Sequence, residues 1–526
     1  REDLARDLNA APAITTSATA VAQNTGARAT NITVHGIDSR MNALYDANTI
    51  PKMLSKPAGQ IFQSVVITQA LQKELGVKVG DTILLTLQKP GDIHPETVLG
   101  ERDISNMVRK LRLIVRAIVS ERGPGGLTLR PHQTSPQNAF VDLKVLQRSL
   151  ESNSKVNTLY VNSNTSDPKT LSKAFQFSDS GLRTRLSNQD IIVESSEIIL
   201  DPRLAAKAKQ AAEKLGAKSS GVFTYLANTI RDKDRTVPYS TITAIETRAG
   251  TPALLGNDQI LLNEWTAKDL QAKQGDEIEI TYYALATGNQ LVTRSAKFTV
   301  ANIIPNDNFD TSFAPDYPGI QNAKHISDWN PPFPVDLKLI RPIDEEYWNQ
   351  YHAAPKAIIS LAAGQKLWSS RFGNLTSLRI FSPPGENVAS FKQKYEHELN
   401  SLITPSDVGW VFQPIREQGL QAAQGSTDFG SLFAGFSFFL IVSAAMLSGL
   451  LFRLGAEQRS AELGTLLAIG YPTRSVSRRL LMEGLILAAI GILIGTALAA
   501  FYAWLMLSGL RSWWQTAIGS SYLQLY

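Results

Sequence analysis

Two long uncharged stretches near the end of the chain limit its fold more than any other feature. They run from Phe429 to Phe452 and from Gly484 to Leu510. Each exceeds the roughly 20 residues that cross the hydrocarbon core of a membrane as a helix. Helices of soluble proteins rarely lack a polar stripe over such a length. We therefore predict transmembrane helices at 429–452 and 484–510.

The segment between these stretches, residues 453–483, is short and basic. It contains five Arg and three Glu, with no Lys or Asp. Because short basic loops remain on the cytoplasmic side of a membrane, we expect this segment to be cytoplasmic. Residues 1–428 then form a large extracytoplasmic domain, and residues 511–526 begin a second extracytoplasmic segment. The formal net charge of the whole chain is only +5, and no basic stripe with interleaved aromatic residues predicts a nucleic-acid partner.

The large domain contains an internal repeat. Two stretches of similar sequence, at 65–83 and 260–278, each predict a strand, a short helix, a Gly-Asp turn and a second strand. Three further matches follow in the same order, pairing 112–119 with 297–304, 139–148 with 357–366, and 157–161 with 376–380. Collinear matches of this kind indicate duplication. We expect an α+β (mixed) domain with repeated modules at about 58–165 and 255–382, followed by transmembrane α-helices.

The sequence lacks the motifs of the common classes of enzyme. Its six His show no zinc-ligand spacing, it has no Cys, and it contains neither a GxSxG motif nor a GxxxxGK[ST] phosphate loop. We therefore predict no catalytic residues, no metal site and no bound cofactor in this chain. The Gly-Asp pairs of the repeat are explained as turns, in which Gly supplies a positive φ and Asp caps the turn.

Two further features allow both a structural and a functional interpretation. The second module carries an insertion rich in Pro and aromatic residues between Ile303 and Tyr351. This insertion either packs as a cover on its own domain or binds a ligand or partner through residues such as Trp329, Phe333 and Trp348. In the second apolar stretch, small residues recur every four positions, at Gly491, Gly495 and Ala499. Such a face lets another helix approach closely, although small residues also recur by chance in an Ala-rich helix.

The basic segment contains a short amphipathic pattern. We predict a helix that begins near Arg459, carries leucines including Leu463 and Leu467 on one side, and ends at Gly470 and Pro472. A helix of this kind beneath a membrane is either an interfacial helix or a peg that docks in the groove of a partner. The residues alone favour neither interpretation.

The pattern RxxExGxLxAxG, followed by Glu483-Gly484 at the head of a Gly-rich stretch, resembles the FtsX-like permease family of ABC transporters. This family includes the MacB-type and lipoprotein-releasing permeases. The resemblance extends to residues 428–447, to residues 355–380 of the second module, and to the Trp pair after the second stretch.

The resemblance implies a permease subunit in the bacterial inner membrane that crosses it several times. Its cytoplasmic loop would contact a separate ABC ATPase, which binds ATP and Mg, and a second permease module would complete the transporter. Lipid, lipoprotein or peptide substrates, or a periplasmic partner, would engage the outer domain. The loop residues to which the resemblance assigns this contact, together with the leucines of the predicted helix, are Arg459, Glu462, Leu463, Gly464, Leu467, Gly470 and Pro472.

The family core has four transmembrane helices, whereas this sequence predicts two, so we expect the chain to be a piece of a longer protein. Two other functions stay open from the sequence. One is a membrane-anchored extracytoplasmic binding or sensor protein without an ATPase partner. The other is a membrane-bound hydrolase with an unrecognised active site. The substrate, the direction of transport and the oligomeric state do not follow from the residues.

Overall fold

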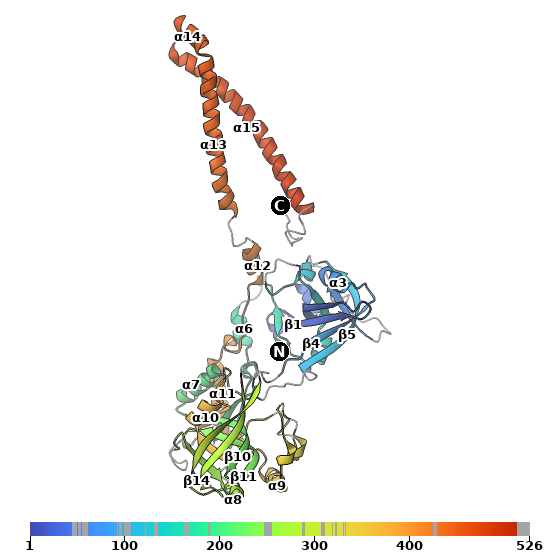
Figure 1. Ribbon diagram of the computed structural model, residues 1–526, viewed down its shortest axis with the longest axis vertical. Coiled ribbons are helices and arrows are strands. Elements are labelled where there is room, and N and C mark those ends of the chain that lie inside the picture. The colour runs from blue at the N-terminus through green and yellow to red at the C-terminus, as the bar shows by residue number, and fades with distance from the viewer. Residues whose placement is uncertain are drawn as a thin grey trace. The chain divides into compact units, whose positions relative to one another are not determined.

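The computed structural model shows two β-sheets with surrounding helices in the first three quarters of the chain, and long helices in the last quarter (Figure 1). Arg1–Ile67, Leu71–Ile118 and Ala139–Phe412 form one compact unit, and Thr68–Ala70, Val119–Asn138 and Gln413–Tyr526 form a second. The structure describes all residues except 45–49, 51–53, 55–61, 92, 94–96, 99–106, 121–122, 131–134, 163–167, 188–189, 247–254, 287–289, 307–310, 318, 321–322, 330, 332, 424–428 and 513–526.

The first sheet has seven strands in the order β2-β6-β3-β5-β4-β1-β7. Its helices cover an apolar core that includes Val65, Ile67, Leu71 and Leu75. The strands are β1 (Ala11–Ala22), β2 (Arg28–Ile37), β3 (Gln63–Thr68), β4 (Thr82–Gln88), β5 (Val108–Val119), β6 (Asn138–Asp142) and β7 (Thr158–Tyr160), and the helices are α1 (Leu4–Asp7), α3 (Gln69–Leu75) and α5 (Leu143–Ser149).

The second sheet has nine strands in the order β11-β15-β12-β14-β13-β10-β16-β9-β8. The strands are β8 (Leu182–Ser187), β9 (Asp190–Ser195), β10 (Lys218–Asp232), β11 (Arg235–Ile245), β12 (Gln259–Asn263), β13 (Glu277–Leu285), β14 (Leu291–Ile304), β15 (Ala357–Ser360) and β16 (Ser377–Phe381). The helices of this region are α6 (Pro168–Ala174), α7 (Pro202–Lys214), α8 (Glu264–Leu270), α9 (Pro342–Tyr351), α10 (Leu361–Trp368) and α11 (Val388–Leu402).

The two sheets share one topology. If β1 to β7 are matched with β10 to β16 in chain order, the first sheet reproduces the first seven positions of the second. The antiparallel hairpin β1–β2 matches β10–β11, and each repeat therefore begins with this hairpin. The segments chosen from the sequence, 58–165 and 255–382, omit it. We call residues 11–160 the first module and residues 218–381 the second module.

The Gly-Asp turns of the two modules have the same hydrogen bonds. Gly80 and Gly275 have φ values of +98° and +93°, which a residue with a side chain rarely adopts. The Asp81 carboxylate accepts from the Lys78 amide at 2.7 Å, and the Asp276 carboxylate from the Lys273 amide at 2.6 Å. These contacts explain both pairs as structural turns.

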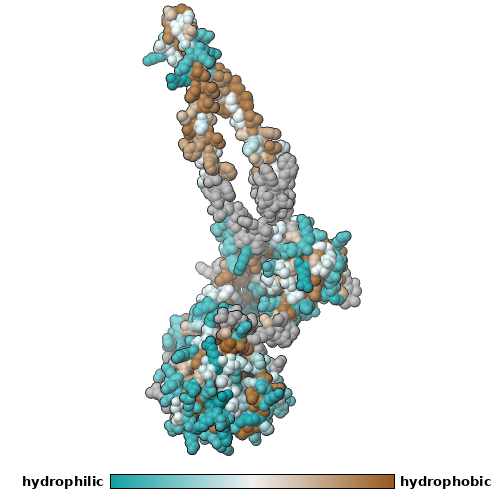
Figure 2. All heavy atoms as spheres, in the orientation of Figure 1, coloured by the Kyte–Doolittle hydropathy of each residue, from teal (hydrophilic) through white to brown (hydrophobic). Residues whose placement is uncertain are grey.

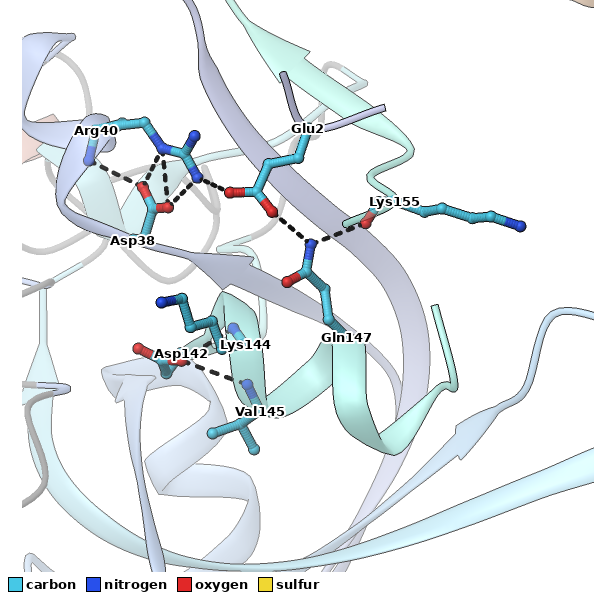
Figure 3. Close-up of polar contacts among 8 residues, drawn as sticks. All are labelled: Glu2, Asp38, Arg40, Asp142, Lys144, Val145, Gln147 and Lys155. Carbon is cyan, nitrogen blue, oxygen red and sulfur yellow. Dashed lines mark hydrogen bonds and ion pairs between the residues drawn. The ribbon is translucent and has the colours of Figure 1, made fainter. Parts of the chain in front are cut away.

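The start of the chain is bound to the first module by polar contacts (Figure 3). The Glu2 carboxylate accepts hydrogen bonds from Arg40 and, at 3.0 Å, from Nε2 of Gln147. Gln147 is a buried residue of α5, and its Nε2 also donates to the Lys155 carbonyl at 3.1 Å. The hydrogen bond from Gln147 and the contact with Arg40 lower the pKa of Glu2. At the other end of α5, the Asp142 side chain caps the helix by accepting from the Lys144 and Val145 amides.

The insertion of the second module packs as a small core of its own. Trp348 of α9 is 3% exposed and Phe333 is 6% exposed, and both belong to a buried cluster with Tyr317 and Ile326. The Trp329 and Trp348 rings meet edge to face at 5.0 Å. The insertion therefore buries the aromatic residues that the sequence offered as ligand contacts.

The C-terminal helices are α12 (Ile415–Ala423), α13 (Phe429–Gln458), α14 (Ser460–Ala468) and α15 (Thr473–Ser512). Within the described residues, two helical stretches are long and apolar enough to cross a membrane, Phe433–Gln458 and Thr473–Gly509. Figure 2 shows apolar side chains along α13 and α15 and hydrophilic ones near the end where they join α14.

Candidate functional site

The helices α13, α14 and α15 form a hairpin whose tip carries the predicted loop residues (Figure 1). The segment 453–483 is mostly helical rather than a free loop, because α13 continues to Gln458 and α15 begins at Thr473. Glu, Gln, Arg and Leu are good helix formers, so leaving the apolar stretch does not end either helix. We call residues 459–472 the hairpin tip.

The turn after α14 has a defined geometry. Gly470, with φ of +96°, lies in the left-handed region just beyond the helix end. Its amide donates to the Leu467 carbonyl at 3.1 Å, and the Tyr471 amide donates to the Leu466 carbonyl at 3.2 Å. These two bonds make a Schellman motif, and Pro472 follows where a proline prevents the helix from continuing. The sequence signals for the end of this helix are thus explained by backbone chemistry.

The leucines of α14 lie on one side of the helix, as their spacing predicts, but they differ in exposure. Leu463 and Leu466 are partly buried, whereas Leu467 is 43% exposed. Ile469 and Tyr471, which flank the turn glycine, are 71% and 42% exposed. Sequence reasoning missed these two residues, although a glycine in a tight turn is a signal that its neighbours point outward. Leu467, Ile469 and Tyr471 form an exposed apolar group at the tip.

The hairpin also carries charged side chains. Arg459 pairs with Glu483 of α15 at 2.9 Å, and Arg453 pairs with Glu457 within α13 at 3.0 Å. All four side chains are more than half exposed, so each pair adds little stability. Arg479 lies over the Tyr471 ring at 5.3 Å from its centre. Glu462 and Gly464 are exposed on α14.

The two long helices approach each other near the tip. A Cβ atom added to Gly484 of α15 would lie 2.8 Å from Phe452 of α13, so glycine permits this contact. By contrast, a Cβ atom on Gly491 or Gly495 would meet no described atom within 4 Å. The helix-packing role of Gly491, Gly495 and Ala499 therefore stays a prediction about a partner helix.

The other predicted residues pack in the insertion, Phe333 also lines a cavity of the second module, and a ligand role for them stays a prediction. Nε1 of Trp348 donates to the Ala323 carbonyl at 3.2 Å, and Phe333 packs beside Tyr283 with ring centres 6.0 Å apart. No group of three or more His, Asp or Glu that could hold a metal ion occurs among the residues that the structure describes. The hairpin tip is thus the site for which the geometry supports a function.

Comparisons with known proteins agree with this emphasis on the C-terminal helices. Residues 434–524 match the family model described as FtsX-like permease C-terminal. Among solved structures, the periplasmic region of MacB from Actinobacillus actinomycetemcomitans is similar at 9% sequence identity and a TM-score of 0.23, over 46% of this chain and 94% of that one. A comparison with curated proteins gave no match. The resemblance predicted from the loop motif is thus confirmed over residues 434–524, which match the C-terminal model of the FtsX-like permeases.

Proposed function

We propose that this chain is the transmembrane permease subunit of an ABC transporter and that its hairpin tip docks on a separate cytoplasmic ATPase. The partner binds ATP and Mg, and its ATP-driven closure moves α13 and α15 and, through them, the extracytoplasmic domain. The match of residues 434–524 to the FtsX-like permeases is the observation that carries this proposal.

The geometry of the tip suits a docking element. Exposed apolar side chains rimmed by polar ones are typical of protein–protein contacts, and Leu467, Ile469 and Tyr471 form such a group beside Glu462. The Schellman turn orders the end of α14, and the close contact between Gly484 and Phe452 joins the two long helices near the tip. A force on α14 is therefore passed to α13 and α15 rather than absorbed in a flexible loop.

The extracytoplasmic domain is the part that would do work outside. Its two modules offer a large surface for a lipid, lipoprotein or peptide substrate or for a periplasmic partner. The exposed small residues of α15 suit a second permease module in the same membrane. In this proposal the protein is a multi-pass protein of the bacterial inner membrane.

A second candidate function is a membrane-anchored binding or sensor protein without an ATPase. The observation that favours it is the composition of the tip, because Ile469 and Tyr471 beside Arg474, Arg478 and Arg479 would also suit an element that lies in the lipid interface. This function predicts that the tip tolerates charge reversal.

Co-purification with candidate ABC ATPases tests the proposal. We expect Glu462→Arg to weaken association and to lower permease-dependent ATP turnover at least tenfold, because it reverses a charge beside the apolar group. Glu457→Arg is the matched control, since Glu457 is an exposed acid of the same hairpin that lies before the tip. Unchanged association and turnover in Glu462→Arg would contradict the proposal and favour the sensor.

A further inference from the structure

The second module contains a cavity of about 670 Å³, a volume typical of small-molecule sites. Its walls come from β10, β13, the end of α10 and the insertion, and Ile93, Thr97 and Val98 add to one side. Seven of the lining residues are aromatic, among them Phe223, Tyr225, Tyr283 and Trp368. Neither the family match nor the proposed coupling mechanism uses this cavity.

The aromatic wall is ordered around Trp368. Its ring is stacked on Tyr225, with centres 5.0 Å apart and planes 6° from parallel. Phe223 and Tyr282 meet the same indole edge to face, at 5.9 Å and 6.3 Å. Rigid aromatic faces of this kind favour another ring in stacked or edge-on contact.

The first module shows that the fold does not require these rings. The β1–β7 and β10–β16 pairings align Ala13 with Val222, which places Ile14 where the second module has Phe223 and Thr16 where it has Tyr225. Alignment of the Gly-Asp turns makes Leu87 the residue equivalent to Tyr282. Alignment of α5 with α10 makes Leu150 the residue equivalent to Trp368. The same topology thus folds around aliphatic side chains and a threonine, and the aromatic wall needs another explanation.

Two residues of the cavity wall each carry a buried polar atom that has no hydrogen-bond partner among the described residues. One is the donor Nε1 of Trp368, a side chain only 6% exposed, and the other is the acceptor Oδ1 of Asn228. A buried polar atom without a partner is unfavourable, and a ligand that supplies the partner recovers that free energy. A ligand that shifts the side chains covering these two atoms and satisfies both must accept one hydrogen bond and donate another.

The cavity wall also contains a strained turn. The Ile199 amide donates to the Glu197 carbonyl at 2.8 Å, and the residue between them, Ile198, has a φ of +68°. A β-branched residue rarely adopts this conformation, which is typical of a tight three-residue turn. Ile198 is buried in the cluster formed by the insertion, so packing holds this turn at the cavity.

We propose that this cavity binds a flat aromatic small molecule that carries both a hydrogen-bond acceptor and a hydrogen-bond donor. Its rings pack against the Trp368–Tyr225 stack, its acceptor receives the Trp368 N–H, and its donor reaches Asn228. The aromatic wall, the two partnerless polar atoms and the volume are independent observations that lead to the same ligand class.

Equilibrium dialysis with the full chain in lipid nanodiscs tests this site, with 2-naphthol as probe and empty nanodiscs to subtract partition into lipid. We expect 2-naphthol to bind at least tenfold more tightly than its saturated counterpart decahydro-2-naphthol. Trp368→Leu, which installs the residue of the first module, should abolish this ring preference. Trp410→Phe changes an indole outside the cavity and should preserve it.

Two gentler variants keep the test valid if Trp368→Leu fails to fold. Trp368→Phe retains a ring but removes the donor, and Asn228→Leu removes the acceptor. Each should retain the ring preference and reduce the preference for 2-naphthol over naphthalene about fivefold. Equal binding of 2-naphthol and decahydro-2-naphthol to the wild type, or wild-type binding by folded Trp368→Leu, would overturn the proposal.

Discussion

At the residue scale, the two modules place a glycine on opposite sides of the same helix–strand contact. In the second module, Gly364 of α10 faces Ala244 of β11, and a Cβ atom on Gly364 would lie 2.3 Å from the Ala244 Cβ. At the equivalent contact of the first module, the glycine is on the strand, as Gly36, and the larger residue is Leu146 on the helix. A small residue on one side therefore permits a larger one on the other.

Gly364→Ala tests this exchange. We expect the substitution to lower the free energy of unfolding by about 1–3 kcal/mol, because the new methyl group overlaps Ala244 and presses on Trp368. Adding Ala244→Gly should restore most of the loss, since it removes the closest contact. Denaturant unfolding of the single and double variants measures both effects. Gly419→Ala on α12, where a Cβ would meet no described atom, is the control and should be neutral or stabilising.

A buried lysine joins the insertion to the second module. Lys356 is 4% exposed, and its Nζ lies 4.4 Å from the centre of the Trp265 ring and 4.8 Å from that of Tyr347. Burial lowers the pKa of Lys356 to about 8, although nearby Asp344 partly opposes the shift. Arg341 pairs with Asp344 at 2.9 Å and with Asp269 at 2.6 Å. The charges of this region are thus held close to aromatic faces and to one another.

The pKa of Lys356 makes stability depend on alkaline pH. Below about pH 8 the lysine is protonated in both the folded and the unfolded protein, so stability does not change. Between about pH 8 and pH 10 only the unfolded state keeps the proton, and stability should rise by about 1.4 kcal/mol per pH unit. The measurement is the free energy of unfolding of the wild type and of Lys356→Met between pH 7.5 and about pH 9.5. The difference between the two proteins should rise with pH. A flat difference would contradict the assignment.

Local chemistry decides which residues the sequence could predict. The Gly-Asp turns were predicted correctly because a positive φ and an Asp cap depend only on neighbouring residues. The contact between Gly364 and Ala244 could not be predicted, because the two residues are far apart in the sequence. The environment of Lys356 was hidden for the same reason.

At the element scale, the end of α11 is linked to the middle of α7. Lys207 of α7 donates to the Leu402 carbonyl at 2.7 Å and pairs with Asp407 at 2.5 Å. Asp407 also accepts from the Thr404 amide at 2.7 Å and from its hydroxyl at 2.6 Å. Burial alone would raise the pKa of Asp407, but the bonds from Lys207 and Thr404 prevail and lower it to about 2. One carboxylate thus holds the end of α11 against α7.

Asp407→Asn should therefore destabilise the protein and change its response to acid. A carboxyl whose folded pKa is lowered contributes stability above its unfolded pKa of 3.8 and loses it as the pH falls toward 2. We expect the variant to be about 2 kcal/mol less stable at pH 7 and the difference to vanish between about pH 4 and pH 2. Urea unfolding at pH 7, 5, 4 and 3 measures this.

Glu277→Gln is the control for this prediction. Glu277 pairs with Lys297 at 2.7 Å, but both side chains are 64% exposed. An exposed pair contributes little to stability, so the variant should match the wild type at each pH. A parallel loss in both variants would show that acid acts on the whole surface rather than through Asp407.

The sequence predicted elements well where the signal lies within one element. The bounds of α11 follow from local signals, because Asn387 caps its start and Pro405 follows its end. The predicted repeat left out the hairpins β1–β2 and β10–β11, because the aromatic residues of β10 have no aromatic counterpart in β1. Only the strand pairing shows that they are equivalent.

At the scale of the whole molecule, the α+β domain, its duplication and the apolar helices were all predictable, because composition and repetition extend over many residues. The part of the candidate site that could be predicted is its chemistry, namely the turn at Gly470 and the charges around it. The exposure of Ile469 and Tyr471 and the continuation of both long helices depend on the folded hairpin. The cavity of the second module depends on contacts between distant segments, so no local pattern indicated it.

Membrane topology is a prediction about the whole molecule, and the chain suits a direct test because it contains no Cys. Single cysteines can be introduced at Ser295, exposed on β14, and at Ser460, exposed at the start of α14. In spheroplasts of cells that express the full-length protein, a membrane-impermeant maleimide should label the cysteine at 295. It should label the cysteine at 460 only after permeabilisation, because basic hairpins remain on the cytoplasmic side.

The unmodified protein supplies the background of this experiment, and its label is subtracted from that of each variant. A permeant maleimide should label both variants equally, which shows that each cysteine is reactive in the folded protein. Labelling at 460 before permeabilisation would place the hairpin tip outside and exclude its contact with a cytoplasmic ATPase. Protection at both positions in intact spheroplasts would place the duplicated domain and the hairpin tip on the same side, which would contradict a membrane-spanning α13.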